Sequence, residues 1–158
     1  MSASRIIHCA VLLAALVPAA ASQGAGAPKD VSVVTVSGER ISLGDGSGPT
    51  ELVFVASWCL PCERAMTGVR RRLGAHRRQG YRVVLVGVSG RQTEEQFTAW
   101  AEKFGFKGPL VYDRDGELER IFRAQLLPWH VVVGRDGKLV HQKDEPPGTE
   151  ELRSWVTR

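Results

Sequence analysis

Short apolar runs alternate along the chain with segments whose apolar residues recur at helical spacing. Residues 52–56 and 82–88 form almost continuous apolar runs bounded by turn residues, which is typical of fully buried strands. Each run is followed by a segment with the pattern of an amphipathic helix. The apolar stripe comprises Cys62, Met66, Val69 and Leu73 in the first segment and Phe97, Trp100, Ala101 and Phe104 in the second. Strands that alternate with helices predict an α/β fold.

The two ends of the folded part add hairpins to this pattern. Residues 31–36 and 41–43 predict a short β-hairpin, and the apolar run after Pro128 turns back at residues 134–137 to predict a second, antiparallel one. A last helix is predicted to follow, capped by Thr149. The sequence therefore predicts a central mixed β-sheet flanked by helices and preceded by an N-terminal β-hairpin.

The N-terminus has the pattern of a secretory signal peptide. A short basic segment (1–5) precedes an apolar stretch (6–17) and the small residues Ala19-Ala20-Ala21, so we expect cleavage after Ala21 and a signal peptide over residues 1–21. The apolar stretch is short against the roughly 20 residues that a membrane span needs, so we expect no stable membrane insertion after cleavage.

Removal of the signal peptide defines the remaining chain. Removing 21 of the 158 residues leaves 137, enough for one domain with a hydrophobic core. Residues 22–30 are small, polar and glycine-rich, which favours a flexible leader. Residues 31–158 then form a single domain. Bulky His8 before Cys9 argues against a lipoprotein signal, and Cys9 leaves with the signal peptide.

The net charge adds little to the prediction of fold and partners. The formal net charge of +4 falls to +3 without Arg5, and such a mild excess gives no indication of a nucleic-acid partner. Basic residues gather in the helix predicted after residue 62, and we interpret them as a solvated face, with an acidic partner or an anionic membrane surface as the alternative. These residues are Arg70, Arg71, Arg72, Arg77 and Arg78.

The candidate chemistry lies in Trp58-Cys59-Leu60-Pro61-Cys62, between the first buried strand and its helix. Backbone amides and the helix dipole favour an anion at a helix N-terminus, so we expect the pKa of the Cys59 thiol to be lowered from about 8.5 into the range of roughly 3.5 to 7.5. Cys62, one turn inside the helix, is expected to be more buried and to act as the resolving thiol.

Two other interpretations of the cysteine pair remain open at this stage. A structural zinc site needs four ligands, and beyond the two cysteines the exported chain offers only His76, His130 and His141, none of which forms a second closely spaced pair. A purely structural disulfide is the other alternative, although so short a loop gains little chain entropy by closing. A redox-active dithiol is favoured over both.

With these motifs in hand, the chain resembles the thioredoxin superfamily, specifically the exported TlpA-like and ResA-like thiol-disulfide oxidoreductases. The resemblance rests on residues 54–62, on Leu127-Pro128 before a strand, and on the Asp136-Gly137 turn. It implies a thioredoxin-like fold with a central β-α insertion between Cys62 and Pro128. It also implies a cis peptide bond before Pro128, and a substrate that binds Trp58, Leu127 and Pro128 as an added strand.

The chain departs from the family at two positions. Thioredoxins carry a buried aspartate six positions before the first cysteine, where this chain has Val53, and ResA-like members usually carry a glutamate where it has Ala65. Either carboxylate would accept the proton of the buried thiol. The acceptor for the Cys62 proton is therefore unassigned.

Three further residues are candidates for tuning the two sulfurs. Leu60 and Pro61 contribute no charge between the cysteines, and this favours a reductant over a strong oxidant. His130 stands where the family commonly has threonine; it is interpreted as a packed strand residue, with tuning of the thiols or metal ligation as the alternative.

The resemblance implies a periplasmic or otherwise extracytoplasmic thiol-disulfide oxidoreductase that reduces disulfides of secreted proteins, with cytochrome c maturation as a candidate process. Electrons would come from a membrane thiol-disulfide carrier, no dissociable cofactor is implied beyond the Cys59–Cys62 pair, and we expect a monomer. The alternatives are a disulfide oxidase, isomerase or maturation factor on the same fold, or a copper-binding chaperone that uses both cysteines and His130.

Overall fold

A five-stranded mixed sheet forms the centre of the computed structural model, which describes residues 31–157. Its strand order is β5-β4-β3-β6-β7. The strands are β3 (Thr50–Val55), β4 (Arg82–Val88), β5 (Leu110–Asp113), β6 (Trp129–Val133) and β7 (Leu139–Lys143). β3, β4 and β5 run parallel, whereas β6 and β7 pair antiparallel to their neighbours, as βαβ units followed by a hairpin require.

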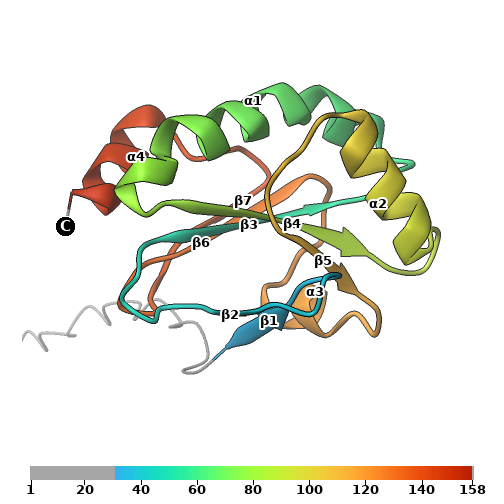
Figure 1. Ribbon diagram of the computed structural model, residues 1–158, viewed down its shortest axis with the longest axis horizontal. Coiled ribbons are helices and arrows are strands. Elements are labelled where there is room, and N and C mark those ends of the chain that lie inside the picture. The colour runs from blue at the N-terminus through green and yellow to red at the C-terminus, as the bar shows by residue number, and fades with distance from the viewer. Residues whose placement is uncertain (1–30, 158) are drawn as a thin grey trace, which may run out of the picture.

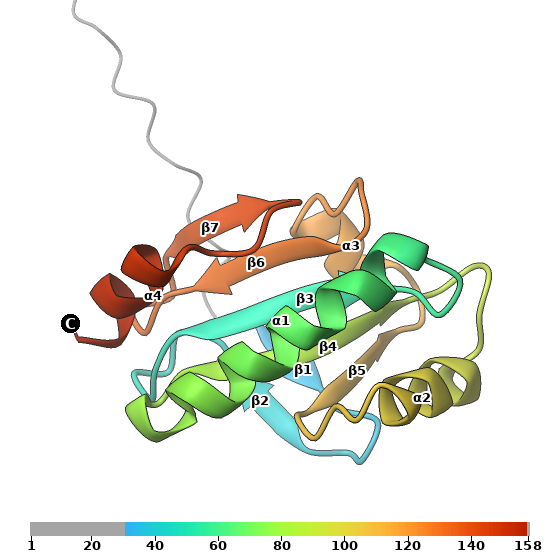
Figure 2. The same cartoon turned by 90° about the horizontal axis from the view of Figure 1, so that it is seen from above.

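Helices and a second small sheet cover the two faces. On one face lie α1 (Leu60–His76), α2 (Glu94–Lys103) and α4 (Thr149–Val156), and Figure 2 shows α1 running over the central strands. On the other face lie α3 (Glu117–Ile121) and the antiparallel hairpin of β1 (Ser32–Val34) and β2 (Arg40–Ser42) (Figure 1). The molecule is therefore built in three layers.

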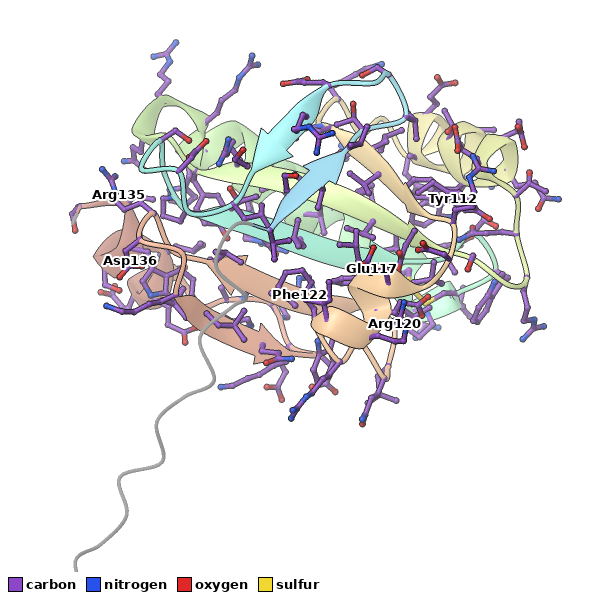
Figure 3. All side chains as sticks on the ribbon, turned by 90° about the horizontal axis from the view of Figure 1, so that it is seen from below. Tyr112, Glu117, Arg120, Phe122, Arg135 and Asp136 are labelled. Carbon is purple, nitrogen blue, oxygen red and sulfur yellow. A yellow bond between two sulfur atoms is a disulfide. The ribbon has the colours of Figure 1, made fainter. Side chains whose placement is uncertain are left out.

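Alternation along β3 assigns its side chains to the two faces. Phe54 packs on the face of α3, where its ring centroid lies 6.2 Å from that of Phe122; the latter is labelled beneath the sheet in Figure 3. Glu51 and Val53 must then point to the opposite face, beneath α1. Every residue of β3 is buried, so this strand is the centre of the hydrophobic core.

The predicted architecture is confirmed, with small differences at element ends. The N-terminal hairpin and the α/β order agree with the prediction, and β5 with α3 forms a β-α unit between β4 and β6. α4 departs in its cap: Gly148, not Thr149, is the N-cap residue, and its N–H donates to Glu151 at 2.8 Å. Glycine is tolerated as the N-cap residue here because the Glu151 side chain, from the first turn, accepts the hydrogen bond of the Gly148 N–H.

The predicted signal peptide (1–21) and leader (22–30) lie outside the described residues. Across residues 31–157, no helix combines the length and the apolar character that crossing a membrane requires.

Candidate active site: a disulfide at the start of a helix

Cys59 and Cys62 form a disulfide where β3 passes into α1. Cys59 is the N-cap residue of the helix, and its sulfur accepts a hydrogen bond from the backbone N–H of Cys62 at 3.2 Å. Pro61 occupies the first turn, where its missing N–H leaves no helical hydrogen bond unmade. The predicted placement of Cys59 at the helix N-terminus is therefore confirmed, and the lowered pKa of its thiol stays a prediction.

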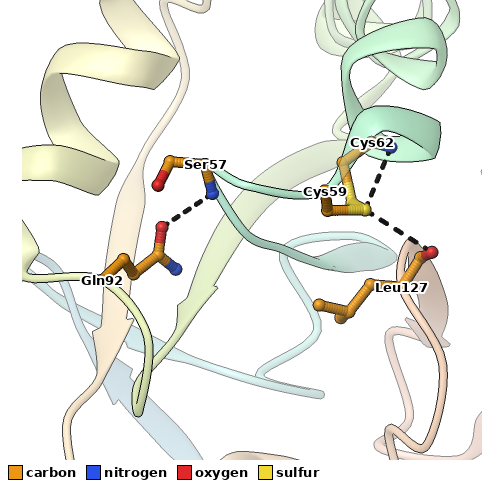
Figure 4. Close-up of a disulfide and its surroundings, with 5 residues drawn as sticks. All are labelled: Ser57, Cys59, Cys62, Gln92 and Leu127. Atoms are coloured by element: carbon orange, nitrogen blue, oxygen red, sulfur yellow. Dashed lines mark hydrogen bonds between the residues drawn. A yellow bond between two sulfur atoms is a disulfide. The ribbon is translucent and has the colours of Figure 1, made fainter.

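The segment before β6 faces this disulfide. The Leu127–Pro128 peptide bond is cis, as the resemblance implied. Sγ of Cys59 lies 3.6 Å from the carbonyl oxygen of Leu127 (Figure 4). In the reduced protein, the thiol could donate to this oxygen. Cys62 is fully buried and Cys59 nearly so, but both Leu127 and Pro128 remain partly exposed beside them.

Three exposed apolar residues flank the site in the chain: Trp58 and Leu60 adjoin Cys59, and Leu126 precedes Leu127. Trp58 is 45% exposed, Leu60 56% and Leu126 58%, among the few large apolar side chains so exposed. We call these three residues the apolar rim. Arg91 lies over the Trp58 ring, with its guanidinium carbon 4.6 Å from the ring centroid. Trp58 is thus held beside the site by a cation–π contact and keeps a free face.

Gln92 holds the turn before the cysteines, a role that the sequence analysis missed. Its side-chain oxygen accepts a hydrogen bond from the N–H of Ser57 at 2.7 Å (Figure 4), and its amide nitrogen donates to the carbonyl of Val88 at 2.6 Å. The loop between β4 and α2 therefore fixes the backbone that leads to Trp58 and Cys59. No local pattern marks this glutamine, because its partner lies 35 positions away.

His130 is buried in a polar cluster beneath α1. Its Nδ1 lies 2.9 Å from Oε1 of Glu51. Arg72 donates one hydrogen bond to each oxygen of the same carboxylate, at 2.7 Å to Oε1 and 2.9 Å to Oε2. The hydroxyl of Tyr81 donates to the same carboxylate at 3.1 Å. We call Glu51, Arg72, Tyr81 and His130 the buried cluster. The interpretation of His130 as a packed strand residue agrees with its burial, but nothing in the sequence indicated these polar partners.

The interpretation of Arg72 as part of a solvated face is wrong. Arg72 shares the inward face of α1 with Cys62, Met66 and Val69, and its guanidinium binds Glu51. Its position, three residues after Val69, continues the apolar stripe of the helix. The arginine is buried because Glu51 on β3 supplies a bidentate partner, whereas Arg70, Arg71, Arg77 and Arg78 are exposed, as predicted.

Electrostatics within the buried cluster favour a charged Glu51. Burial alone would raise the pKa of this carboxyl, but the hydrogen bonds and charges of His130 and Arg72 outweigh burial and lower the pKa to about 2. Burial and the adjacent Glu51 carboxylate raise the pKa of Tyr81 well above its usual range. Glu51 is therefore an acceptor for three donors around it.

The predicted site residues fall into two groups. Trp58, Leu60, Pro61, Leu127 and Pro128 surround or adjoin the Cys59–Cys62 disulfide. His130 belongs instead to the buried cluster, two residues further along β6. Within residues 31–157, no group of three His, Cys, Asp or Glu side chains is arranged to hold a metal ion.

Comparison with known proteins agrees with the fold. The AhpC/TSA family profile matches residues 24–142. The chain is 29% identical to sporulation thiol-disulfide oxidoreductase A of Bacillus subtilis over 126 residues, which cover 77% of this chain and 74% of the relative. It is 24% identical over 136 residues to the thiol-disulfide oxidoreductase ResA of Bacillus thuringiensis, covering 85% of this chain and 77% of the relative.

A solved structure extends the likeness to three dimensions. The solution structure of a putative thioredoxin from Neisseria meningitidis superposes with a TM-score of 0.71 at 18% identity, covering 84% of this chain and 88% of the other. The thioredoxin-like fold predicted from the sequence is thereby confirmed.

Proposed function

Because this chain belongs to the AhpC/TSA family, and its two cysteines pair at a helix start, we propose that it is an extracytoplasmic thiol-disulfide oxidoreductase that reduces disulfides in exported proteins. The observation that carries the proposal is the position of the Cys59 sulfur. Cys59 is the N-cap residue of α1, and its sulfur lies 3.6 Å from the carbonyl oxygen of Leu127, a partly exposed residue of the cis-proline segment.

The reaction proceeds by two exchanges. In the reduced protein, the Cys59 thiolate attacks one sulfur of a substrate disulfide, so that a mixed disulfide forms and the other substrate sulfur leaves as a thiolate. Cys62 then loses its proton and attacks Cys59, which releases the second substrate thiolate and closes the Cys59–Cys62 disulfide. Two electrons pass to the substrate, and its two thiolates take up protons.

The surface around the disulfide suits an extended peptide. The cis-proline segment lies just before β6, and its residues Leu127 and Pro128 are partly exposed, so a substrate strand can pair with this segment. The apolar rim of Trp58, Leu60 and Leu126 can cover the apolar side chains of such a peptide. Catalysis then depends on positioning the substrate sulfur in line with Cys59.

The remaining parts of the proposal rest on the sequence. The N-terminal pattern supports export to the periplasm or another extracytoplasmic space, and the uncharged Leu60-Pro61 pair supports a reductant. A membrane thiol-disulfide carrier would return electrons to the oxidised protein, an apocytochrome c is a candidate substrate, and the protein would act as a monomer. The electrons reside in the cysteine pair, so no dissociable cofactor is required.

Trapping tests the reaction. With Cys62→Ser, the mixed disulfide should persist as a covalent adduct of Cys59 that dithiothreitol releases, and mass spectrometry would identify the partner. The matched control is the Cys59→Ser/Cys62→Ser variant, which should trap nothing. Absence of any thiol-dependent adduct would contradict substrate turnover through Cys59.

The redox potential tests the direction. Equilibration with glutathione buffers should give a potential well below that of a strong oxidant. A value near −120 mV, the approximate potential of DsbA, would overturn the assignment as a reductase and favour the oxidase alternative.

A further inference from the structure

Resolution of the mixed disulfide requires a proton acceptor near Cys62, because the thiol is buried and only its thiolate attacks. Val53 on β3 and Ala65 on α1 have apolar side chains, which cannot accept a proton. The acceptor must therefore come from elsewhere in the layer between the sheet and α1.

His130 lies opposite one of these apolar positions. In the antiparallel ladder of β3 and β6, His130 pairs with Val53, so their side chains project from the same face and their Cβ atoms are about 4.5 to 5.5 Å apart. That face is covered by α1, whose inward residues include Cys62. The β3–β6 pairing therefore places the His130 imidazole beside Val53, where β3 has no side chain that could act as a base.

The partners of Nδ1 fix the tautomer of His130. Oε1 of Glu51 is an acceptor, and it receives hydrogen bonds from Arg72 at 2.7 Å and from Nδ1 at 2.9 Å. Arg72 can only donate, and its Nη2 lies 3.4 Å from Nδ1, but the shorter contact of Nδ1, at 2.9 Å, is with the Glu51 carboxylate oxygen, which can only accept. Nδ1 must therefore carry a proton, and in a neutral ring Nε2 has a free lone pair.

Nε2 is the part of the cluster without a partner. Among the described residues, this buried nitrogen has no hydrogen bond, although buried polar atoms normally have one. It is the ring nitrogen farther from Glu51, and in this oxidised structure it has no hydrogen bond to Cys62, although both residues lie between the sheet and α1. A carboxylate that orients an imidazole through one nitrogen, and leaves the other free to accept a proton, is the arrangement of a general base.

On these grounds we propose that His130 accepts the Cys62 proton when the mixed disulfide resolves, and that Glu51 is its positioning residue. The inference rests on the proposed thiol-disulfide exchange. The Cys62 S–H proton moves to Nε2, directly or through one water, while Nδ1–H stays bonded to Glu51. The Cys62 sulfur then bonds to Cys59, the bond from Cys59 to the substrate sulfur breaks, and the departing thiolate is protonated.

The charged groups around the imidazole are compatible with this role. Glu51 faces it from β3, Arg72 from α1, and Lys143 is its exposed cross-strand neighbour on β7. Tyr81, just before β4, binds the other oxygen of Glu51. The imidazole therefore has one carboxylate and one guanidinium beside it, and the guanidinium is already paired with that carboxylate.

Single-turnover kinetics separate the two exchanges. The reduced protein is mixed with a fluorogenic disulfide peptide between pH 5 and 9, and closure of the Cys59–Cys62 disulfide is followed by quenched-flow alkylation. We expect His130→Gln to slow resolution about a hundredfold at pH 7, the lower end of general base catalysis, and to converge on the wild type at high pH. Formation of the mixed disulfide, measured with Cys62→Ser in both backgrounds, should change less than threefold.

A matched control comes from the neighbouring strand. His141 on β7 is also buried and pairs with Val132, so it lies on the same face of the sheet, but its Nε2 bonds the carbonyl of Glu145. His141→Gln should leave the resolution rate and its pH profile unchanged. Wild-type resolution in His130→Gln, or equal slowing of both exchanges, would overturn the role of His130. Failure to form any mixed disulfide would instead contradict the proposed function.

A measurement on the unaltered protein covers the case in which His130→Gln does not fold. Nitrogen-15 spectra of the imidazoles in the reduced protein should show His130 as the Nδ1–H tautomer with an unprotonated Nε2. The Nε2–H tautomer would leave no lone pair for the thiol proton and would overturn the proposal.

Discussion

The two halves of α1 differ in what they pack against the same two strands. Its N-terminal end carries the Cys59–Cys62 disulfide, beside the partly exposed residues Leu127 and Pro128 and the apolar rim. Its later turns bring Arg72 into the core, against Glu51 of β3 and His130 of β6. At the disulfide end, the two cysteines are buried but are bordered by the exposed side chains of the apolar rim. In the buried cluster, polar and charged side chains bind one another in place of water.

This difference predicts a separation of effects. Substitution of Cys59 by serine, or of a residue in the apolar rim, should lower activity and leave the stability of the reduced protein almost unchanged, because these changes remove little buried packing. Substitutions in the buried cluster should lower stability first, because each member is a partner for another buried polar group. A substitution that lowers activity and stability to the same degree would contradict this separation.

The largest effect is expected for Cys59→Ser. Turnover of a disulfide peptide should fall to the uncatalysed background, because the hydroxyl is neither acidic nor nucleophilic enough to attack a disulfide. The free energy of unfolding, measured in urea against dithiothreitol-reduced wild type, should change by less than about 1 kcal/mol. Retention of turnover would show that the reaction enters through another residue.

In the buried cluster, Glu51→Gln should have the largest effect on stability. It leaves the Arg72 guanidinium without its counter-charge, and the breaking of a buried pair costs about 3 to 5 kcal/mol. Urea unfolding measures the loss. Replacement of both partners, Glu51→Leu with Arg72→Met, should cost less than the sum of the two single changes by roughly 2 kcal/mol. Strict additivity would mean that the pair does not interact as the structure shows.

Acid should weaken the cluster in a defined range of pH. The pKa of Glu51 is lowered from 4.5 to about 2 on folding, so the folded state binds fewer protons than the unfolded state between these values. Its contribution is therefore complete above about pH 4.5 and is lost as the pH falls toward 2, with a magnitude of about 3 kcal/mol. Unfolding in urea at several pH values should show a steeper acid loss for the wild type than for the Glu51→Leu/Arg72→Met variant. Equal slopes would exclude Glu51 as the source.

Gln92→Ala should affect both stability and activity, but moderately. The partly buried Ser57 amide loses its acceptor, which costs at most about 1 to 3 kcal/mol, and the turn that carries Cys59 loosens. Turnover should fall several-fold, short of the roughly hundredfold loss that full misplacement produces. Gln142→Ala is the matched control, because Gln142 also bonds a backbone carbonyl, that of Phe122, but on the face away from α1. A comparable loss of turnover in the control would trace the effect to stability alone.

The sequence predicted the disulfide end far better than the buried cluster, and the reason is separation along the chain. Cys59 and Cys62 are three positions apart, so strand, turn, helix and chemistry are visible in one window. Glu51 is 21 positions from Arg72 and 79 from His130, and no local pattern joins them. A glutamate beside an apolar run reads as a strand end, and an arginine in a basic stretch reads as solvent-facing. Only the β3–β6 register, together with the stripe of α1, brings these three residues to one place.

The smallest effect is expected for Arg91→Ala at the apolar rim. The guanidinium lies 4.6 Å from the Trp58 ring centroid, and a cation–π contact at an exposed site contributes about 0.5 to 1 kcal/mol. Because neither side chain is part of the core, the free energy of unfolding should change by no more than that amount, while the tryptophan gains freedom beside the disulfide.

The expected kinetic result is a KM for a disulfide peptide raised about two- to threefold with kcat unchanged, since 0.5 kcal/mol corresponds to roughly a twofold change in an equilibrium constant. Lys103→Ala is the control, because Lys103 lies 5.5 Å from the Phe104 ring at the C-terminal end of α2, and its loss should leave KM unchanged. A stability loss above 2 kcal/mol in Arg91→Ala would contradict the division between the two halves of α1, because it would make the rim part of the structural core.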